Sequence, residues 1–99
     1  MTRHLVLSPK AARDVDDVWN YSARTWSVAQ ADRYINGLRD LLRLLCDTPG
    51  LARLRRDVDP PVRLHPYRSH VIIFRSDPPL LDVLRILHAR ADWRARMLE

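Results

Sequence analysis

A chain of 99 residues with 46% hydrophobic content is long enough for one small core and too short for two, so residues 1–99 are expected to form a single domain. Two glycines exclude a glycine-rich phosphate loop, and one cysteine excludes a disulfide framework and a cysteine-based zinc site. The net charge of +5 lies mostly in the second half, which indicates an acidic partner (nucleic acid or protein) or a solvated basic surface.

The predicted elements begin with a short strand over His4–Leu7 and a helix over about residues 9–25. Ser8 and Pro9 are an N-cap residue and a proline in the first helical turn. Apolar residues then recur every three or four positions, and the opposite face, which includes Asp14, is polar. The predicted apolar stripe comprises Ala12, Val15, Val18, Trp19, Ser22 and Trp26.

A second helix is predicted to begin after Ser27, which forms a capping-box pattern with Gln30. It ends before the helix-breaking segment Thr48–Gly50. Its apolar stripe comprises Val28, Ala31, Ile35, Leu38, Leu42 and Leu45. Because about two residues join the two helices, we expect them to run antiparallel as a helical hairpin.

Residues 51–61 predict a basic loop, because the double proline at its end is incompatible with a helix. Three strands are predicted next, over Val62–His65, His70–Arg75 and Leu80–Leu87. The short turns between them favour an antiparallel meander. A last helical turn is predicted over Asp92–Met97.

The predicted order is β-αα-βββ, an α+β fold in which the N-terminal helical hairpin packs on a small, mainly antiparallel sheet. Strand alternation assigns one set of side chains to the core: Ile72, Phe74, Leu84 and Ile86. The alternate set on the exposed face comprises Ile73, Arg75, Val83, Arg85 and, on the first strand of the meander, Arg63. A register error of one residue would reverse these two faces.

Three sequence blocks stand in order along the chain: the opening LSPKAARDVDDVWNYSARTWSVAQADRYINGL, the hairpin SHVIIFR and the closing VLRILHARADW. Together they resemble the ParE branch of the RelE/ParE toxin family, over about residues 5–94. The resemblance implies a toxin of a type II toxin–antitoxin module that inhibits DNA gyrase and hence replication. It also implies a small acidic ParD-like antitoxin that neutralises the toxin in a hetero-oligomer and makes the pair's contact with DNA.

A second function stays open, because RelE-like relatives cut ribosome-bound mRNA. RNA cleavage through the 2′-hydroxyl needs a base, an acid and cations at the phosphate, and His88, Arg85 and Arg75 are the candidates. Trp93 stands where such nucleases typically carry a tyrosine or histidine, and an indole has no acid–base role. We therefore favour a non-enzymatic toxin. An inactive toxin that only binds its antitoxin and a plain nucleic-acid-binding domain are further alternatives.

Two sets of contact residues are predicted. The candidates for the target surface are Arg75, Arg85, His88, Arg90 and Trp93. The candidates for the antitoxin surface are Tyr21, Trp26, Arg53, Arg55 and Arg56. An acidic segment with apolar anchors needs a basic surface with apolar pockets. Each residue type also has a purely structural alternative: a solvated arginine, a histidine that caps a turn, or a tryptophan that packs on the core.

No metal or cofactor is expected, because the four histidines and Cys46 lack metal-ligand spacing. A lone cysteine in a leucine-rich helix is typical of a structural thiol. The short polar N-terminus and the lack of a long apolar run favour a cytoplasmic protein without a membrane partner.

Overall fold

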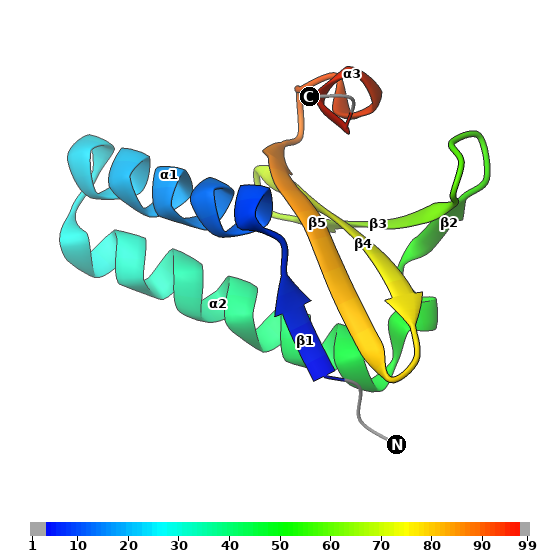
Figure 1. Cartoon of the computed structure of the whole chain (residues 1–99). Helices are drawn as coiled ribbons and strands as arrows, with labels where there is room; N and C mark the ends of the chain where they lie inside the picture. The colour runs from blue at the N-terminus through cyan, green and yellow to red at the C-terminus, as the bar shows by residue number, and fades with distance from the viewer. Residues whose placement is uncertain (1–3, 98–99) are drawn as a thin grey trace.

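A helical hairpin packs on one face of a five-stranded sheet in the computed structural model, which describes residues 4–97 (Figure 1). The elements are β1 (His4–Leu7), α1 (Pro9–Thr25), α2 (Val28–Asp47), a 3₁₀ turn (Pro49–Leu51), β2 (Arg53–Arg55), β3 (Val62–Tyr67), β4 (His70–Asp77), β5 (Leu80–His88) and α3 (Trp93–Met97). The predicted α+β class and element order are confirmed, with one strand added. No helix among the described residues is long and apolar enough to cross a membrane.

Both long helices begin at the predicted caps. The Ser8 Oγ atom accepts a hydrogen bond of 3.0 Å from the N–H of Ala11, and the Ser27 Oγ atom accepts one of 3.0 Å from the N–H of Gln30. These bonds satisfy backbone donors that have no partner inside the first helical turn. Only Trp26 and Ser27 separate the helices, so α1 and α2 run antiparallel as predicted (Figure 1).

The strands follow the spatial order β1-β5-β4-β3-β2. The first strand is parallel to β5, and the other neighbours are antiparallel, which confirms the predicted meander. The prediction of a loop throughout residues 51–61 is wrong, because Arg53–Arg55 form β2 and pair with β3. Three residues are too few for an alternation signal, and this strand forms because β3 offers it a free edge.

A bulge in β5 changes which side chains face the helices. Ile73 pairs with Arg85 but Phe74 pairs with Val83, so Leu84 is left without a partner on β4. The extra residue reverses the alternation. The core positions predicted for Ile72, Phe74 and Ile86 are confirmed. The predicted exposure of Val83 is wrong, because it is fully buried under the helices, and Leu84 packs on the opposite face instead.

Apolar clusters cover both faces of the sheet. The larger lies between the sheet and the helices and includes Leu38, Leu42, Leu45, Ile72, Phe74, Leu81, Val83 and Ile86. The smaller lies on the other face and joins Val62, Ile73 and Leu87 to the half-buried Leu84, Trp93 and Met97. The predicted exposure of Ile73 is therefore wrong, because the C-terminal segment covers this face.

The predicted helical stripes hold in the middle of the hairpin and fail at its ends. Trp26 and Val28 are 61% and 57% exposed, because they flank the hairpin loop, which extends beyond the sheet (Figure 1). Near the start of α1 the buried side chains are those of Ala11 and Asp14, while Ala12 is exposed. The prediction that Asp14 lies on the polar face is wrong, because this carboxylate is buried in an ion pair with Arg85.

Candidate partner-binding site

Arg85, predicted as an exposed cation, is 6% exposed and forms an ion pair inside the fold. Its Nε and Nη2 atoms donate hydrogen bonds of 2.8 and 3.0 Å to the two carboxylate oxygens of Asp14. Its Nη1 atom donates a bond of 3.1 Å to the carbonyl of Arg96. The prediction that Arg85 lies on an exposed sheet face is wrong, because the bulge and α1 enclose it. The Arg85 guanidinium therefore links α1, β5 and the C-terminal segment.

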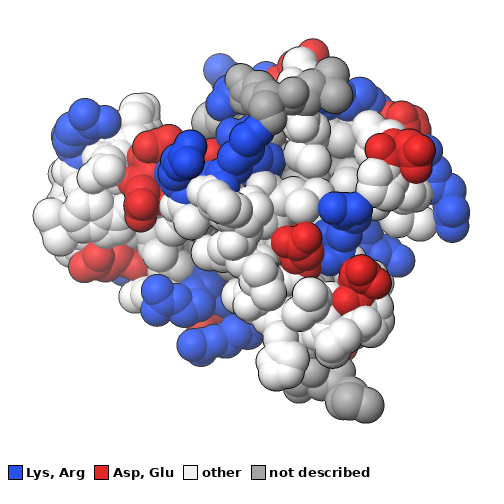
Figure 2. Space-filling view, in the orientation of Figure 1, with Lys and Arg blue, Asp and Glu red and all other residues white. Residues whose placement is uncertain are grey.

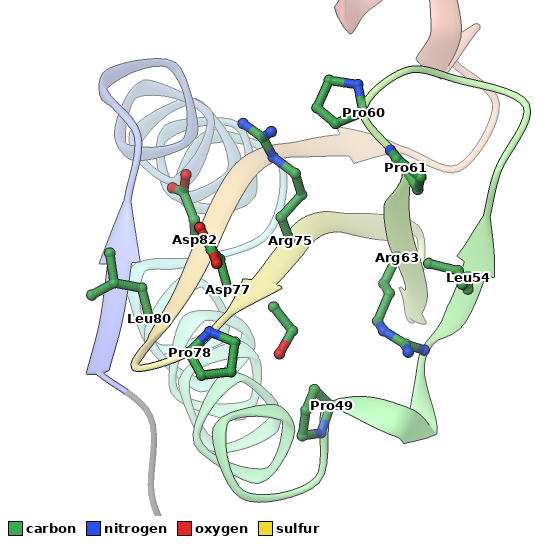
Figure 3. A pocket seen from close by; sticks show the side chains of 11 residues that line it. Pro49, Leu54, Pro60, Pro61, Arg63, Arg75, Asp77, Pro78, Leu80 and Asp82 are labelled. Atoms are coloured by element: carbon green, nitrogen blue, oxygen red, sulfur yellow. The ribbon is translucent and has the colours of Figure 1, made fainter.

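The three residues proposed for RNA cleavage are not brought together. Arg75 pairs with Asp82 in the register of the β4–β5 hairpin, whereas His88 ends β5 six residues later, about 20 Å away along the strand. Arg75 lines a cavity of about 580 Å³ that also contains Arg63, Asp77 and Asp82. Figure 3 shows the Arg63 and Arg75 side chains directed away from each other there. This cavity carries mixed charge and no histidine.

A groove of about 470 Å³, here called the hairpin groove, runs between the helical hairpin and the end of the sheet. Tyr21 and Trp26, both predicted to contact an antitoxin, lie together on its helical side. Their rings meet edge to face with centroids 6.1 Å apart, and they are 58% and 61% exposed. Two large exposed aromatic rings beside a groove are typical of a protein-binding surface.

Tyr34 and His70, which line the hairpin groove, belong to a hydrogen-bonded cluster that joins α2 to the sheet. The hydroxyl oxygen of Tyr34 lies 2.7 Å from Nδ1 of His70, and the Tyr67 hydroxyl donates a 2.7 Å bond to the Tyr34 carbonyl. The rings of His70 and His88 meet edge to face at 5.6 Å. Burial lowers the pKa of His70, and the charge of His88 lowers it further; burial also raises the pKa of Tyr34. A neutral His70 that accepts a hydrogen bond from Tyr34 is consistent with both shifts.

Sequence reasoning missed this cluster, since Tyr34, Tyr67 and His70 come from three separate elements. The sequence feature that could have indicated this cluster was Gly37, a glycine inside a predicted helix. A Cβ atom at this helical position would collide with the Tyr67 hydroxyl, so a glycine is needed for the tyrosine to lie across α2.

A second groove, here called the arginine groove, crosses the sheet face that carries the smaller cluster. It has a volume of about 340 Å³ and is lined by Arg53, Arg55, Leu64, Pro66, Arg68, His70, Val71, Ala89, Ala91 and Trp93. Two predicted antitoxin contacts, Arg53 and Arg55, therefore share one groove with Trp93, a predicted target contact.

Trp93 also packs the C-terminal segment onto the sheet. The guanidinium groups of Arg55 and Arg94 lie 5.3 and 4.7 Å from its ring centroid. Both arginines bind the Asp57 carboxylate, and the bonds from Arg94 and then Arg55 lower the pKa of Asp57 to about 2. The remaining candidates, Arg56 and Arg90, are exposed and line neither groove.

Basic and acidic side chains are interspersed on the face drawn in Figure 2. A uniform basic field, which a plain nucleic-acid-binding domain would use, is not seen on that face.

Known proteins resemble this chain along most of its length. A family profile described as "ParE toxin of type II toxin-antitoxin system, parDE" matches residues 5–93. "Toxin ParE1" of Caulobacter vibrioides is 30% identical over 91 residues, which cover 92% of this chain and 94% of the relative. "Toxin ParE1" of Mycobacterium tuberculosis is 28% identical over 93 residues, which cover 93% and 95%.

A solved structure is similar in fold. It is described as "Chromosomal ParDE TA system from P. aeruginosa", and its matching chain gives a TM-score of 0.75 at 19% identity. The match covers 88% of this chain and 96% of that one. At this identity the likeness concerns the fold alone.

Proposed function

The chain belongs to the ParE toxin family of type II toxin–antitoxin systems, and from this membership we propose that it inhibits DNA gyrase and is neutralised by a ParD-like antitoxin. The observation that carries the proposal is the extent of the family match. It runs from residue 5 to residue 93 and so takes in both long helices, β2 to β5, all of β1 except His4, and Trp93.

The hairpin groove is our candidate for the antitoxin site. Exposed tryptophan and tyrosine side chains contribute large shares of binding energy when a partner covers them, and Tyr21 and Trp26 are such residues. His88 lies along the same groove and suits a carboxylate of an acidic partner. Apolar anchors flanked by acidic residues would therefore complement this surface.

We propose that the toxin acts by binding rather than by catalysis. A nuclease would need His88 and two cations around one phosphate. The Arg85 guanidinium is bound to Asp14, and Arg75 lies near the opposite end of β5. Exposed His88 and Arg90 at the end of β5, with Trp93 beyond them, stay our candidates for the target surface.

A supercoiling assay tests the proposal. Purified toxin is added to DNA gyrase and relaxed plasmid, with and without the antitoxin, beside a cell-free translation reaction in which the mRNA ends are mapped. We expect lost supercoiling or accumulated cleaved plasmid, intact mRNA and rescue by the antitoxin. Normal supercoiling with new mRNA ends that disappear in His88→Ala would show a nuclease instead.

A further inference from the structure

Within residues 4–97 the sheet has two edge strands, β1 and β2, and they differ in charge. β2 carries Arg53 and Arg55, and charged side chains disfavour the pairing of an edge strand with another chain. β1 has no charged side chain at pH 7 and no proline. Its residues Leu5, Val6 and Leu7 are 39%, 41% and 38% exposed. An apolar edge strand without these protections is suited to pairing with a further strand.

The outer edge of β1 also has backbone groups available for hydrogen bonds. The N–H groups of His4 and Ser8 donate bonds of 2.8 and 2.9 Å to carbonyls on the β5 side. In a parallel ladder every second residue bonds to the same neighbour, so Leu5 and Leu7 direct their N–H and C=O groups away from β5. Figure 1 draws no helix or strand in front of β1. These groups can therefore be reached by another strand.

We propose that β1 pairs with β1 of a second copy of this chain, antiparallel and about a two-fold axis at Val6. In this register Leu5 of each copy lies opposite Leu7 of the other, and each such pair exchanges two backbone hydrogen bonds. All the outward N–H and C=O groups of the two residues are then bonded. The two five-stranded sheets become one continuous sheet. Because the axis is two-fold, the assembly closes as a dimer.

The charges of the two edges favour a second copy over an acidic antitoxin as the occupant of β1. Identical uncharged strands meet without repulsion, and Figure 2 shows largely uncharged surface over β1. Leu80 lies beside His4 in the β1–β5 register and is 40% exposed, so it extends the apolar surface. An acidic partner gains no charge attraction from β1, since the arginines that would attract it lie on β2. This inference goes beyond the proposed function and does not rest on it.

Sedimentation equilibrium of the purified toxin, without antitoxin, is the first test. An edge of four residues gives a small interface of the weak, transient class, below about 1,200 Å². We therefore expect the average mass to rise from that of one chain, 11.6 kDa, toward twice that value as the protein concentration increases.

Leu5→Pro removes an outward N–H and leaves the N–H groups that bond to β5, so this variant should stay monomeric at every concentration. The matched control is Leu5→Ala, which loses the same side chain but keeps the N–H and should still dimerise. Thermal melts check that both variants are folded. Equal dimerisation of the two variants would overturn the proposed backbone pairing.

A cysteine at the two-fold axis tests the register by a second route. The Cα atoms of the two Val6 residues would lie about 4.5 Å apart, within the range that a disulfide needs. Val6→Cys should therefore form a covalent dimer when a mild oxidant such as diamide is added. Leu80→Cys is the control, because it matches the exposure of Val6 but lies on β5, three strand spacings or about 14 Å from its copy. The native Cys46 is buried in the core.

Two results would overturn the inference. One is a toxin that stays monomeric at all concentrations, with Val6→Cys cross-linking no faster than Leu80→Cys. The other is a monomeric wild-type toxin whose antitoxin affinity, measured by calorimetry, falls in Leu5→Pro but not in Leu5→Ala; the β1 edge would then serve the antitoxin. Neither result affects the proposed inhibition of gyrase, which the supercoiling assay tests separately.

Discussion

Asp14 and Arg85, 71 positions apart in the sequence, form a buried bidentate ion pair at the edge of the sheet. The same Asp14 carboxylate accepts a 3.0 Å bond from the backbone N–H of Ile86. β1 pairs with β5 only as far as Val83, so the edge of β5 has no strand neighbour beyond that point. Asp14 takes the place of the missing strand, and this is why a charged residue lies on the inner face of α1.

Replacement of Asp14 by alanine should lower the free energy of unfolding by about 3–5 kcal/mol, because it leaves the Arg85 charge buried without its carboxylate. The double variant Asp14→Leu with Arg85→Met should lose less stability than the single variant, since no uncompensated buried charge remains. Urea titrations measure all three proteins. Asp17→Ala, at an exposed position of the same helix, is the control. A single variant no less stable than this control would contradict a stabilising role for the ion pair.

Local sequence patterns predicted the elements well, because capping and periodicity are local properties. Ser8, Ser27 and the turn residues placed both helices and the meander. The bulge at Leu84 and the inward position of Asp14 were missed. Both depend on how β5 meets α1: the Ser8 hydroxyl donates a 2.7 Å bond to the Leu84 carbonyl at the bulge. No periodicity within a single segment reports a contact between segments 76 positions apart.

The candidate site was less predictable than the fold. Tyr21 and Trp26 were each predicted from the sequence as antitoxin contacts, and their rings lie together. Arg55 and Trp93 were assigned to different surfaces, although they share a groove. That groove depends on β2, which was expected to be a loop, and on the return of the C-terminal segment across the sheet. Both are tertiary features that the composition of the two segments does not report.

Leu38→Asp should abolish folding. Leu38 is 2% exposed in the larger core cluster, and an aspartate there would bury a charge without a partner. The cost exceeds the margin of a small domain, whose total stability is about 5–15 kcal/mol. Leu44→Asp is the matched control, because Leu44 lies on the same helix and is 49% exposed. Thermal melts followed by circular dichroism should show no cooperative transition for Leu38→Asp and a near-native transition for the control. A wild-type-like melt of Leu38→Asp would disprove the assignment of the helical core.

Trp26→Ala should weaken antitoxin binding without destabilising the toxin. The side chain is 61% exposed, so little packing is lost in the free protein. If the antitoxin covers it, truncation should cost about 2 kcal/mol or more, equal to about 30-fold in Kd. Calorimetric titration measures the affinity, and thermal melts check the fold. Leu51→Ala, which removes a 54% exposed side chain from the 3₁₀ turn, should leave the affinity unchanged. Equal affinities of the two variants would remove Trp26 from the interface.

The contact between Asp57 and the C-terminal segment should respond to acid. Bonds from Arg94 and Arg55 lower the pKa of this carboxyl from 3.8 to about 2. A lowered carboxyl pKa means that the contact is complete above pH 3.8 and is lost as the pH falls through about 2. The indole resonance of Trp93 should therefore shift over this range. Asp57→Asn should show the shifted resonance already at neutral pH, and an unshifted resonance in that variant would contradict the role given to Asp57.

His70 should make the stability of the fold depend on pH near neutrality. Burial, assisted by the charge of His88, lowers the pKa of His70 below its ordinary value of 6.5. The unfolded chain then binds a proton that the folded chain resists, so stability is lost as the pH falls below 6.5 toward the folded pKa. His70→Gln keeps an acceptor for the Tyr34 hydroxyl and does not titrate. Its urea midpoint should fall less than that of the wild type between about pH 7.5 and about pH 5. His4→Gln, which replaces an exposed histidine, is the control, and its urea midpoint should fall as much as that of the wild type. If the urea midpoints of the wild type and His70→Gln fall equally, His70 is not the titrating group.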